Sequence, residues 1–134
     1  TLISLFHRTL PCRILNDDTV VLTWSDGRFM LWGTPWARID HVAPSAAGHP
    51  IERLFVIDHG VENTLRPLSG VPAVRLLLGQ LQRIWPLSAT VAVIDRLCEL
   101  AARVPIDELL FVPDERAVHL IADRLGGHRG EARP

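Results

Sequence analysis

Residues 19–33 read TVVLTWSDGRFMLWG, and residues 72–84 read PAVRLLLGQLQRI. The first stretch follows the two-residue period of β-strands, whereas the second repeats its apolar residues every three to four positions, as amphipathic helices do. The change of period near Pro72 therefore predicts a β-rich N-terminal half and a helical C-terminal half.

The centre of the first stretch is a turn signal. Asp26 and Gly27 stand between two apolar runs, and Asp-Gly in that position predicts a β-hairpin because its turn requires positive φ. A two-residue loop pairs Trp24 with Phe29 and Leu22 with Leu31 on one face. The opposite face then carries Val21, Thr23, Met30 and Trp32. Because both faces are bulky, we expect helices to cover one side of the sheet and a partner chain or further structure the other.

Further strands are predicted from alternation or from β-branched content. They span residues 2–8, 12–15, 36–42 and 54–58. Residues 16–18, Asn-Asp-Asp, supply turn chemistry before the hairpin. Residues 43–50 and 60–71 are predicted to connect elements without regular structure, the second because it contains Pro67 and Gly70.

The helices are placed by their end signals. Pro72 suits the first turn of one helix, which Pro86 stops, and Ser88 can cap a second helix that Pro105 ends. The second helix is expected to bury the face formed by Val91, Ile94, Leu97, Cys98 and Ala101. Residues 108–112 are either extended or one helical turn.

A third helix is predicted after Asp114, which can cap it. Its core face is formed by Val118, Ile121, Ala122 and Leu125. Gly126 and Gly127 then end it.

These elements predict an α+β fold. An antiparallel β-meander of four to six strands over about residues 1–59 is followed by two or three helices packed on one face of the sheet. Residues 1–125 are expected to form a single domain, and residues 126–134 a flexible tail. The alternative is an α/β fold with a partly parallel sheet, in which residues 54–58, 91–95 and 109–112 are strands. The polar stripe from Ala92 to Arg103 favours a helix over residues 88–104 instead.

Charge and composition limit the class of protein. The 134 residues carry 14 basic and 15 acidic side chains, and a net charge of −1 provides no long-range field toward nucleic acid or anionic membranes. Every basic residue apart from histidine is Arg, which is typical of a GC-rich bacterial genome. Only Cys12 and Cys98 are present, and no secretion signal or membrane-spanning run is recognisable, so a cytoplasmic protein is expected.

The apolar content favours association with another chain. Hydrophobic residues make up 48% of the sequence, and one small core is not expected to hide all of them. Trp24, Trp32 and Trp36 lie close together around the hairpin, and exposed tryptophans dominate interface energetics. Met30, Trp32 and Trp36 are therefore the candidate contact surface.

Two constellations are candidates for chemistry. The tripeptide Ile-Asp-His occurs at residues 39–41 and 57–59, and His41 with His59 could bind a divalent metal if their strands were neighbours. In the parallel-sheet alternative, Asp58, Asp95 and Asp114 follow apolar runs and could hold a metal or a phosphate. Two histidines are too few ligands for a metal site, and Asp and His next to each other in a strand point to opposite faces.

The sequence carries no nucleophile elbow, phosphate-binding loop or Cys-x-x-Cys motif. No cofactor and no metal is predicted. The favoured hypothesis is a cytoplasmic interaction, self-assembling or adaptor domain without catalysis, whose partner is itself or another protein. The alternative is a small metal- or phosphate-dependent enzyme that uses the Asp and His residues at the strand ends.

Overall fold

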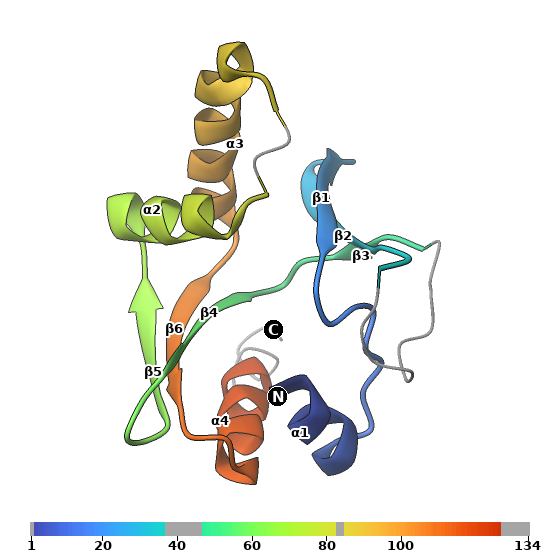
Figure 1. The fold of residues 1–134 in the computed structure, drawn as a ribbon, viewed down its shortest axis with the longest axis vertical. Helices are drawn as coiled ribbons and strands as arrows, with labels where there is room; N and C mark the ends of the chain where they lie inside the picture. The colour runs from blue at the N-terminus through green and yellow to red at the C-terminus, as the bar shows by residue number, and fades with distance from the viewer. Residues whose placement is uncertain (1, 37–46, 83–84, 127–134) are drawn as a thin grey trace, which may run out of the picture. The chain divides into compact units, whose positions relative to one another are not determined.

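The computed structural model describes residues 2–36, 47–82 and 85–126 (Figure 1). The chain divides into two compact units, here called the first unit (residues 1–51 and 112–134) and the second unit (residues 52–111). The predicted α+β class is confirmed, with an antiparallel meander in the N-terminal half, a second and mixed sheet, and four α-helices in the described residues. The single domain over residues 1–125 and the tail over residues 126–134 stay predictions.

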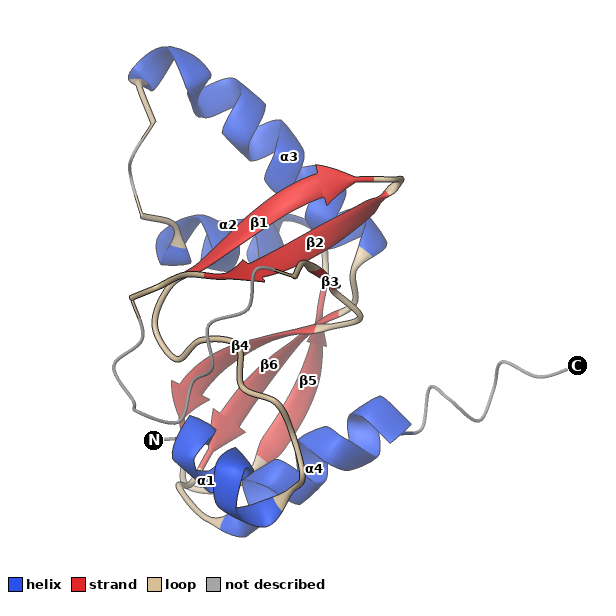
Figure 2. Cartoon of the chain, turned by 90° about the vertical axis from the view of Figure 1, so that its right-hand side faces the viewer, coloured by secondary structure: helices blue, strands red, loops and turns tan. Residues whose placement is uncertain are grey.

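The first unit contains two helices and one sheet. Its elements are α1 (Leu2–Thr9), β1 (Val20–Ser25), β2 (Arg28–Gly33), β3 (His49–Pro50) and α4 (Glu115–Gly126). The three strands form an antiparallel sheet in the order β1-β2-β3. Figure 2 draws the strands of this sheet, and those of the sheet in the second unit, in red.

The hairpin prediction is confirmed residue by residue. Asp26 and Gly27 have φ values of 52° and 75°, the left-handed values that a two-residue hairpin turn requires. Trp24 pairs with Phe29, and the remaining pairs are Val20 with Gly33, Val21 with Trp32, Leu22 with Leu31, Thr23 with Met30 and Ser25 with Arg28. The rings of Trp24 and Phe29 meet edge to face with centroids 4.7 Å apart.

The predicted turn before the hairpin is also confirmed. Asn16 Oδ1 accepts hydrogen bonds from the backbone N–H groups of Asp18 (2.7 Å) and Thr19 (3.1 Å). The side-chain amide of Asn16 donates to the backbone oxygen of Thr34 at 2.9 Å. The Asn16 side chain therefore closes a local turn and ties the chain entering β1 to the chain leaving β2.

The predicted strand over residues 2–8 is wrong, because this segment forms α1. Leu2 and Leu5 lie one helical turn apart and are buried, and α1 packs against α4. With apolar residues at 2, 3, 5 and 6, the short segment fits both periods, and contact with a neighbouring helix decides between them. The predicted strand over residues 12–15 is wrong as well, since these residues have no regular structure and Cys12 is exposed.

Two predictions fall on or next to residues 37–46, which lie outside the described part. Of the predicted strand over residues 36–42, only Trp36 is described, and it is not in a strand. The predicted connector over residues 43–50 is wrong at its end, where His49 and Pro50 form β3 beside β2. Met30 pairs with Pro50 and Leu31 with His49 in this short ladder.

The prediction of a helix after Asp114 is confirmed in α4. Asp114 Oδ1 accepts a hydrogen bond from the backbone N–H of Arg116 at 3.0 Å, as the residue before a helix does. A side-chain hydrogen bond from Arg116 to Asp114, and then the charge of Asp114, raise the pKa of the Arg116 guanidinium. Of the predicted core face, Val118 and Ile121 are buried and Leu125 is exposed.

The second unit is built around one central strand. Its elements are β4 (Leu54–His59), β5 (Thr64–Leu68), α2 (Gly70–Gln80), the 3₁₀ turn η1 (Leu87–Ala89), α3 (Thr90–Arg103) and β6 (Ile106–Phe111). The sheet has the order β4-β6-β5, with β6 parallel to β4 and antiparallel to β5. Of the segment over residues 108–112, residues 108–111 are therefore extended in β6, and four of the six residues of β6 are buried.

The connector prediction over residues 60–71 is wrong, because its middle forms β5. Pro67 has no backbone N–H, yet a strand can contain proline where it lies at the edge of a sheet. β5 is an edge strand, which is why Pro67 is tolerated there.

The alternative α/β fold is correct for one pair of parallel strands and wrong for its third strand. Residues 54–58 and 109–112 do contribute to parallel neighbours, β4 and β6. Residues 91–95 form no strand, because Thr90–Arg103 is the helix α3. The predicted cap at Ser88 is wrong, since α3 starts at Thr90 after η1 and no side chain caps it. None of the helices in the described residues is long and apolar enough to cross a membrane.

The predicted buried face of α3 is only partly buried. Leu97 and Leu100 are buried, whereas Val91 is 71% exposed and Cys98 is exposed. The described helix that packs on α3 is α2. One neighbouring helix covers a narrower stripe than the apolar residues of α3 span, so part of the predicted face stays in water.

A buried ion pair joins Arg53, which directly precedes β4, to Asp107 of β6 in the second unit. Asp107 is fully buried in the central strand, and its carboxylate accepts a hydrogen bond from Arg53, whose side chain is 6% exposed. A second ion pair crosses from β6 to β5, where Arg66 meets Glu108 at 2.5 Å with side-chain exposures of 64% and 23%. Removing one member of a buried pair leaves a charge in a site with little water, whereas an exposed pair adds little stability.

We expect Asp107→Asn to lower the free energy of unfolding by about 3 kcal/mol or more, because Arg53 loses the buried carboxylate that balances its charge. The same change of carboxylate to amide at the next residue, Glu108→Gln, should cost about 1 kcal/mol or less. Urea unfolding of both variants and of the parent chain measures this difference. Equal losses for the two variants would contradict the assignment of the buried pair as the stronger contributor.

Candidate functional site

The candidate functional site is the outer edge of β1. Among residues 2–36, 47–82 and 85–126, the sheet order is β1-β2-β3, and β1 has a neighbouring strand on one side only. Its first three residues are apolar and exposed, with 39% of Val20, 47% of Val21 and 36% of Leu22 accessible. Since neighbouring residues of a strand point to opposite faces, β1 presents apolar surface on both faces next to a backbone edge.

The other sheet edges of the described residues carry features that discourage pairing. β3 has only two residues, one of which is Pro50. β5 contains Arg66 and Pro67, and β4 ends in Asp58 and His59. Short length, proline and charged side chains are the devices that protect sheet edges from pairing with other chains.

β1 has none of these protective features. Its sequence is VVLTWS, without a charged residue or a proline. The register with β2 runs without interruption from Val20 to Ser25, so no bulge bends the strand away from an incoming chain. An exposed, regular and apolar edge strand is a template for strand addition.

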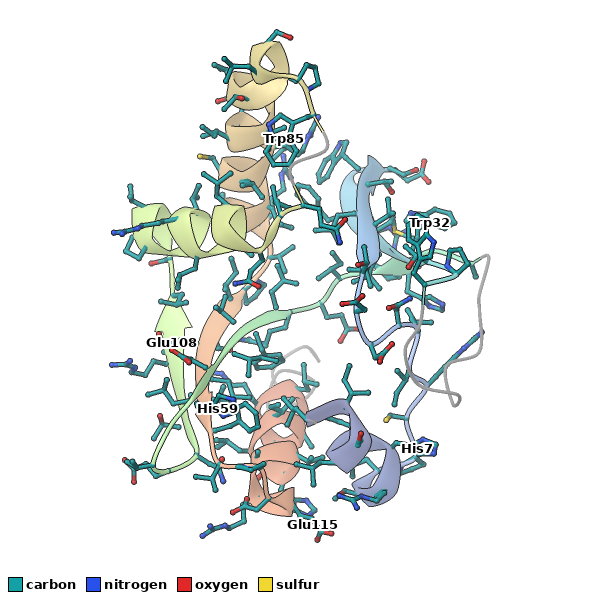
Figure 3. All side chains as sticks on the ribbon, in the orientation of Figure 1. His7, Trp32, His59, Trp85, Glu108 and Glu115 are labelled. Carbon is teal, nitrogen blue, oxygen red and sulfur yellow. The ribbon has the colours of Figure 1, made fainter. Side chains whose placement is uncertain are left out.

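The predicted contact surface of Met30, Trp32 and Trp36 lies next to this edge in part. Trp36 is 67% exposed, whereas Met30 and Trp32 are half-buried. Met30 and Trp32 share a face with Val21 and Thr23 of β1. Trp32 is held in place by its own unit, since its indole N–H donates to Thr23 Oγ1 at 2.8 Å (Figure 3). The role of the three residues as a contact surface stays a prediction.

Gly48 also fixes the position of Trp32. A Cβ atom at Gly48 would lie 2.6 Å from Cζ2 of the Trp32 ring, closer than a carbon contact allows. The backbone at residue 48 therefore lies directly against the indole. Together with the bond to Thr23, this contact orients the ring on the face that β1 shares.

The histidine pair cannot be assembled from the described residues. His41 lies outside them. His59 is exposed at the end of β4 and stacks on Phe111 with ring centroids 5.2 Å apart (Figure 3). Asp58 Oδ1 accepts a hydrogen bond from the backbone N–H of His59 at 2.8 Å.

The three acidic candidates have different surroundings. Asp58 is the last residue but one of β4, Asp95 is exposed on α3, and Asp114 caps α4 and binds Arg116. Asp58 and Asp95 belong to the second unit and Asp114 to the first. No group of three or more His, Cys, Asp or Glu side chains in the described part is placed to hold a metal ion.

Sequence reasoning placed the candidate surface on the tryptophans and missed the edge of β1. The missed signal was the run of seven uncharged residues from Thr19 to Ser25. That run identifies a strand without identifying its place in the sheet. Comparisons of the chain with protein-family models, with curated proteins and with solved structures find no match.

We expect Gly48→Ala to destabilise the first unit by about 1–3 kcal/mol, because the added methyl group forces the Trp32 ring from its place. The matched control is Gly79→Ala in α2, where a Cβ atom meets nothing within 4 Å. That change should raise stability by about 0.5–1 kcal/mol, since alanine is the better helix former. Urea unfolding followed by tryptophan fluorescence measures both effects, and an unchanged midpoint for Gly48→Ala would contradict the close contact.

Proposed function

We propose that this chain is a non-catalytic interaction domain, of the adaptor or self-assembling kind, that binds an extended protein segment at the outer edge of β1. The observation that carries the proposal is the contrast between β1, which is exposed and unprotected, and the protected edges of β3, β4 and β5. In strand addition, backbone hydrogen bonds give affinity, and contacts with alternate side chains give specificity.

The dimensions of β1 suit this mode of binding. Its six residues span about 20 Å at the usual rise of a strand. An incoming strand would meet Val20 and Leu22 on one face, and Val21 and Thr23 on the other. Burial of these apolar side chains adds to the backbone bonds and favours apolar partner residues at alternate positions.

A cytoplasmic bacterial setting is part of the proposal. Cys12 and Cys98 are both free and exposed, which suits a reducing compartment. The use of Arg without Lys supports a GC-rich bacterial source. Neither observation bears on the choice of partner.

The test is a charge placed on the edge. We expect Val21→Lys to abolish protein association, because a lysine on an edge strand opposes pairing with another strand. Val21 is 47% exposed, so the substitution should change the stability of the unit by less than about 0.5 kcal/mol. Native mass spectrometry of tagged protein purified from its own cells measures the loss of any bound chain.

The matched control is Val61→Lys, the same substitution at a fully exposed residue between β4 and β5. It should leave every association that the parent chain shows unchanged. The proposal fails if the parent chain carries bound protein and Val21→Lys retains it. It also fails if neither the parent chain nor the variants associate with any protein, including a second copy.

A further inference from the structure

The sequence of the exposed edge is close to a palindrome. Thr19, which directly precedes β1, and the first four residues of β1 read Thr-Val-Val-Leu-Thr, with a threonine at each end, an aliphatic residue inside each threonine, and Val21 at the centre. The same three central residues are the exposed apolar residues of β1. An antiparallel partner that matches this pattern has the same sequence read in the opposite direction.

We propose that the partner of β1 is the β1 strand of a second copy, paired antiparallel about a two-fold axis at Val21. This inference rests on the proposed function and names its partner. Val21 then lies opposite Val21 of the second copy, Val20 opposite Leu22, and Thr19 opposite Thr23. Apolar pairs and threonine pairs directly opposite each other are favourable in antiparallel sheets.

A two-fold axis at Leu22 or at Thr23 would also keep the two faces of the joined sheet aligned. Both registers pair the side chains of β1 less favourably. Within β1, an axis at Leu22 places Val21 opposite Thr23 of the second copy, so Val21 loses an apolar partner. An axis at Thr23 places Val20 opposite Asp26, which takes an apolar residue out of an apolar pair. The axis at Val21 pairs the three exposed apolar residues of one copy, Val20, Val21 and Leu22, with those of the other.

The pairing joins the two three-stranded sheets into one continuous sheet in the order β3-β2-β1-β1-β2-β3. Directly opposite residues point to the same face, so Val21, Met30 and Trp32 of both copies share one face of the joined sheet. The contact uses the same patch on both copies and therefore closes as a dimer instead of growing into a fibre.

Disulfide trapping tests the register. In a Cys12→Ser and Cys98→Ser background, we expect Val21→Cys to form a disulfide-linked dimer on mild oxidation, because directly opposite Cβ atoms lie about 4.5–5.5 Å apart. Thr23→Cys is the matched control on the same face of β1. Its sulfur would lie about 13 Å from that of the second copy, four strand positions away, so it should stay monomeric in a denaturing gel. The combination of Thr19→Cys with Thr23→Cys should restore the linked dimer.

Sedimentation velocity of the purified chain tests the dimer itself over about 1–100 µM, since dimer content depends on concentration. We expect a dimer for the parent chain and for Val61→Lys. The dimer dissociation constant of Val21→Lys should be about tenfold higher or more, because two ammonium groups lie opposite each other.

Each outcome separates this inference from the proposed function. A parent chain that is monomeric throughout, while Val21→Lys loses a different protein in cells, would overturn the self-pairing and leave strand addition in place. A dimer that survives Val21→Lys, or one that is trapped by Thr23→Cys and not by Val21→Cys, would overturn the pairing at Val21. Association that is unchanged by Val21→Lys, both in cells and with purified protein, would overturn both proposals.

Discussion

The positive φ angles of Asp26 and Gly27 are the constraint on which the regular edge of β1 depends. A two-residue turn with these angles fixes the register of β1 against β2, and a slip of one residue would move every side chain to the other face. The register places Trp24 on Phe29 and Val21 beside Trp32, and it pairs β1 with β2 without a bulge from Val20 to Ser25. Without that regular register, the exposed edge would not match another strand.

The edge strands of the two sheets differ in how well they are protected from pairing with another chain. This difference supports the proposed binding at β1. In the second unit, the central strand β6 is paired on both sides and buried, with Asp107 held by Arg53, and the outer strands carry charge or proline. In the first unit, β3 forms one edge of the sheet and has only two residues. The other edge is β1, which exposes apolar side chains on both faces. An edge left unprotected keeps its capacity to pair, which suits binding better than solubility.

The fold was predictable where a local signal has one meaning. Asp-Gly between apolar runs, and a carboxylate before an apolar-periodic segment at Asp114, each define a local structure that the protein adopts. The prediction was wrong where a short segment fits two periods, as in α1, or where a proline was taken to exclude a strand, as in β5. The candidate site was harder, because the exposure of Val91 or Val21 depends on which neighbours cover it, and no local pattern states that.

The sequence by itself determined the hairpin, the existence of a helix around Pro72 and the absence of charge from residues 19–25, because turn angles, periodicity and side-chain chemistry are local properties. Only the tertiary structure decided that residues 2–9 form a helix, that β6 inserts between β4 and β5, and that β1 lies at an edge. Strand order and burial arise from contacts between residues far apart in the chain. Those contacts turn an ordinary apolar strand into a candidate binding edge.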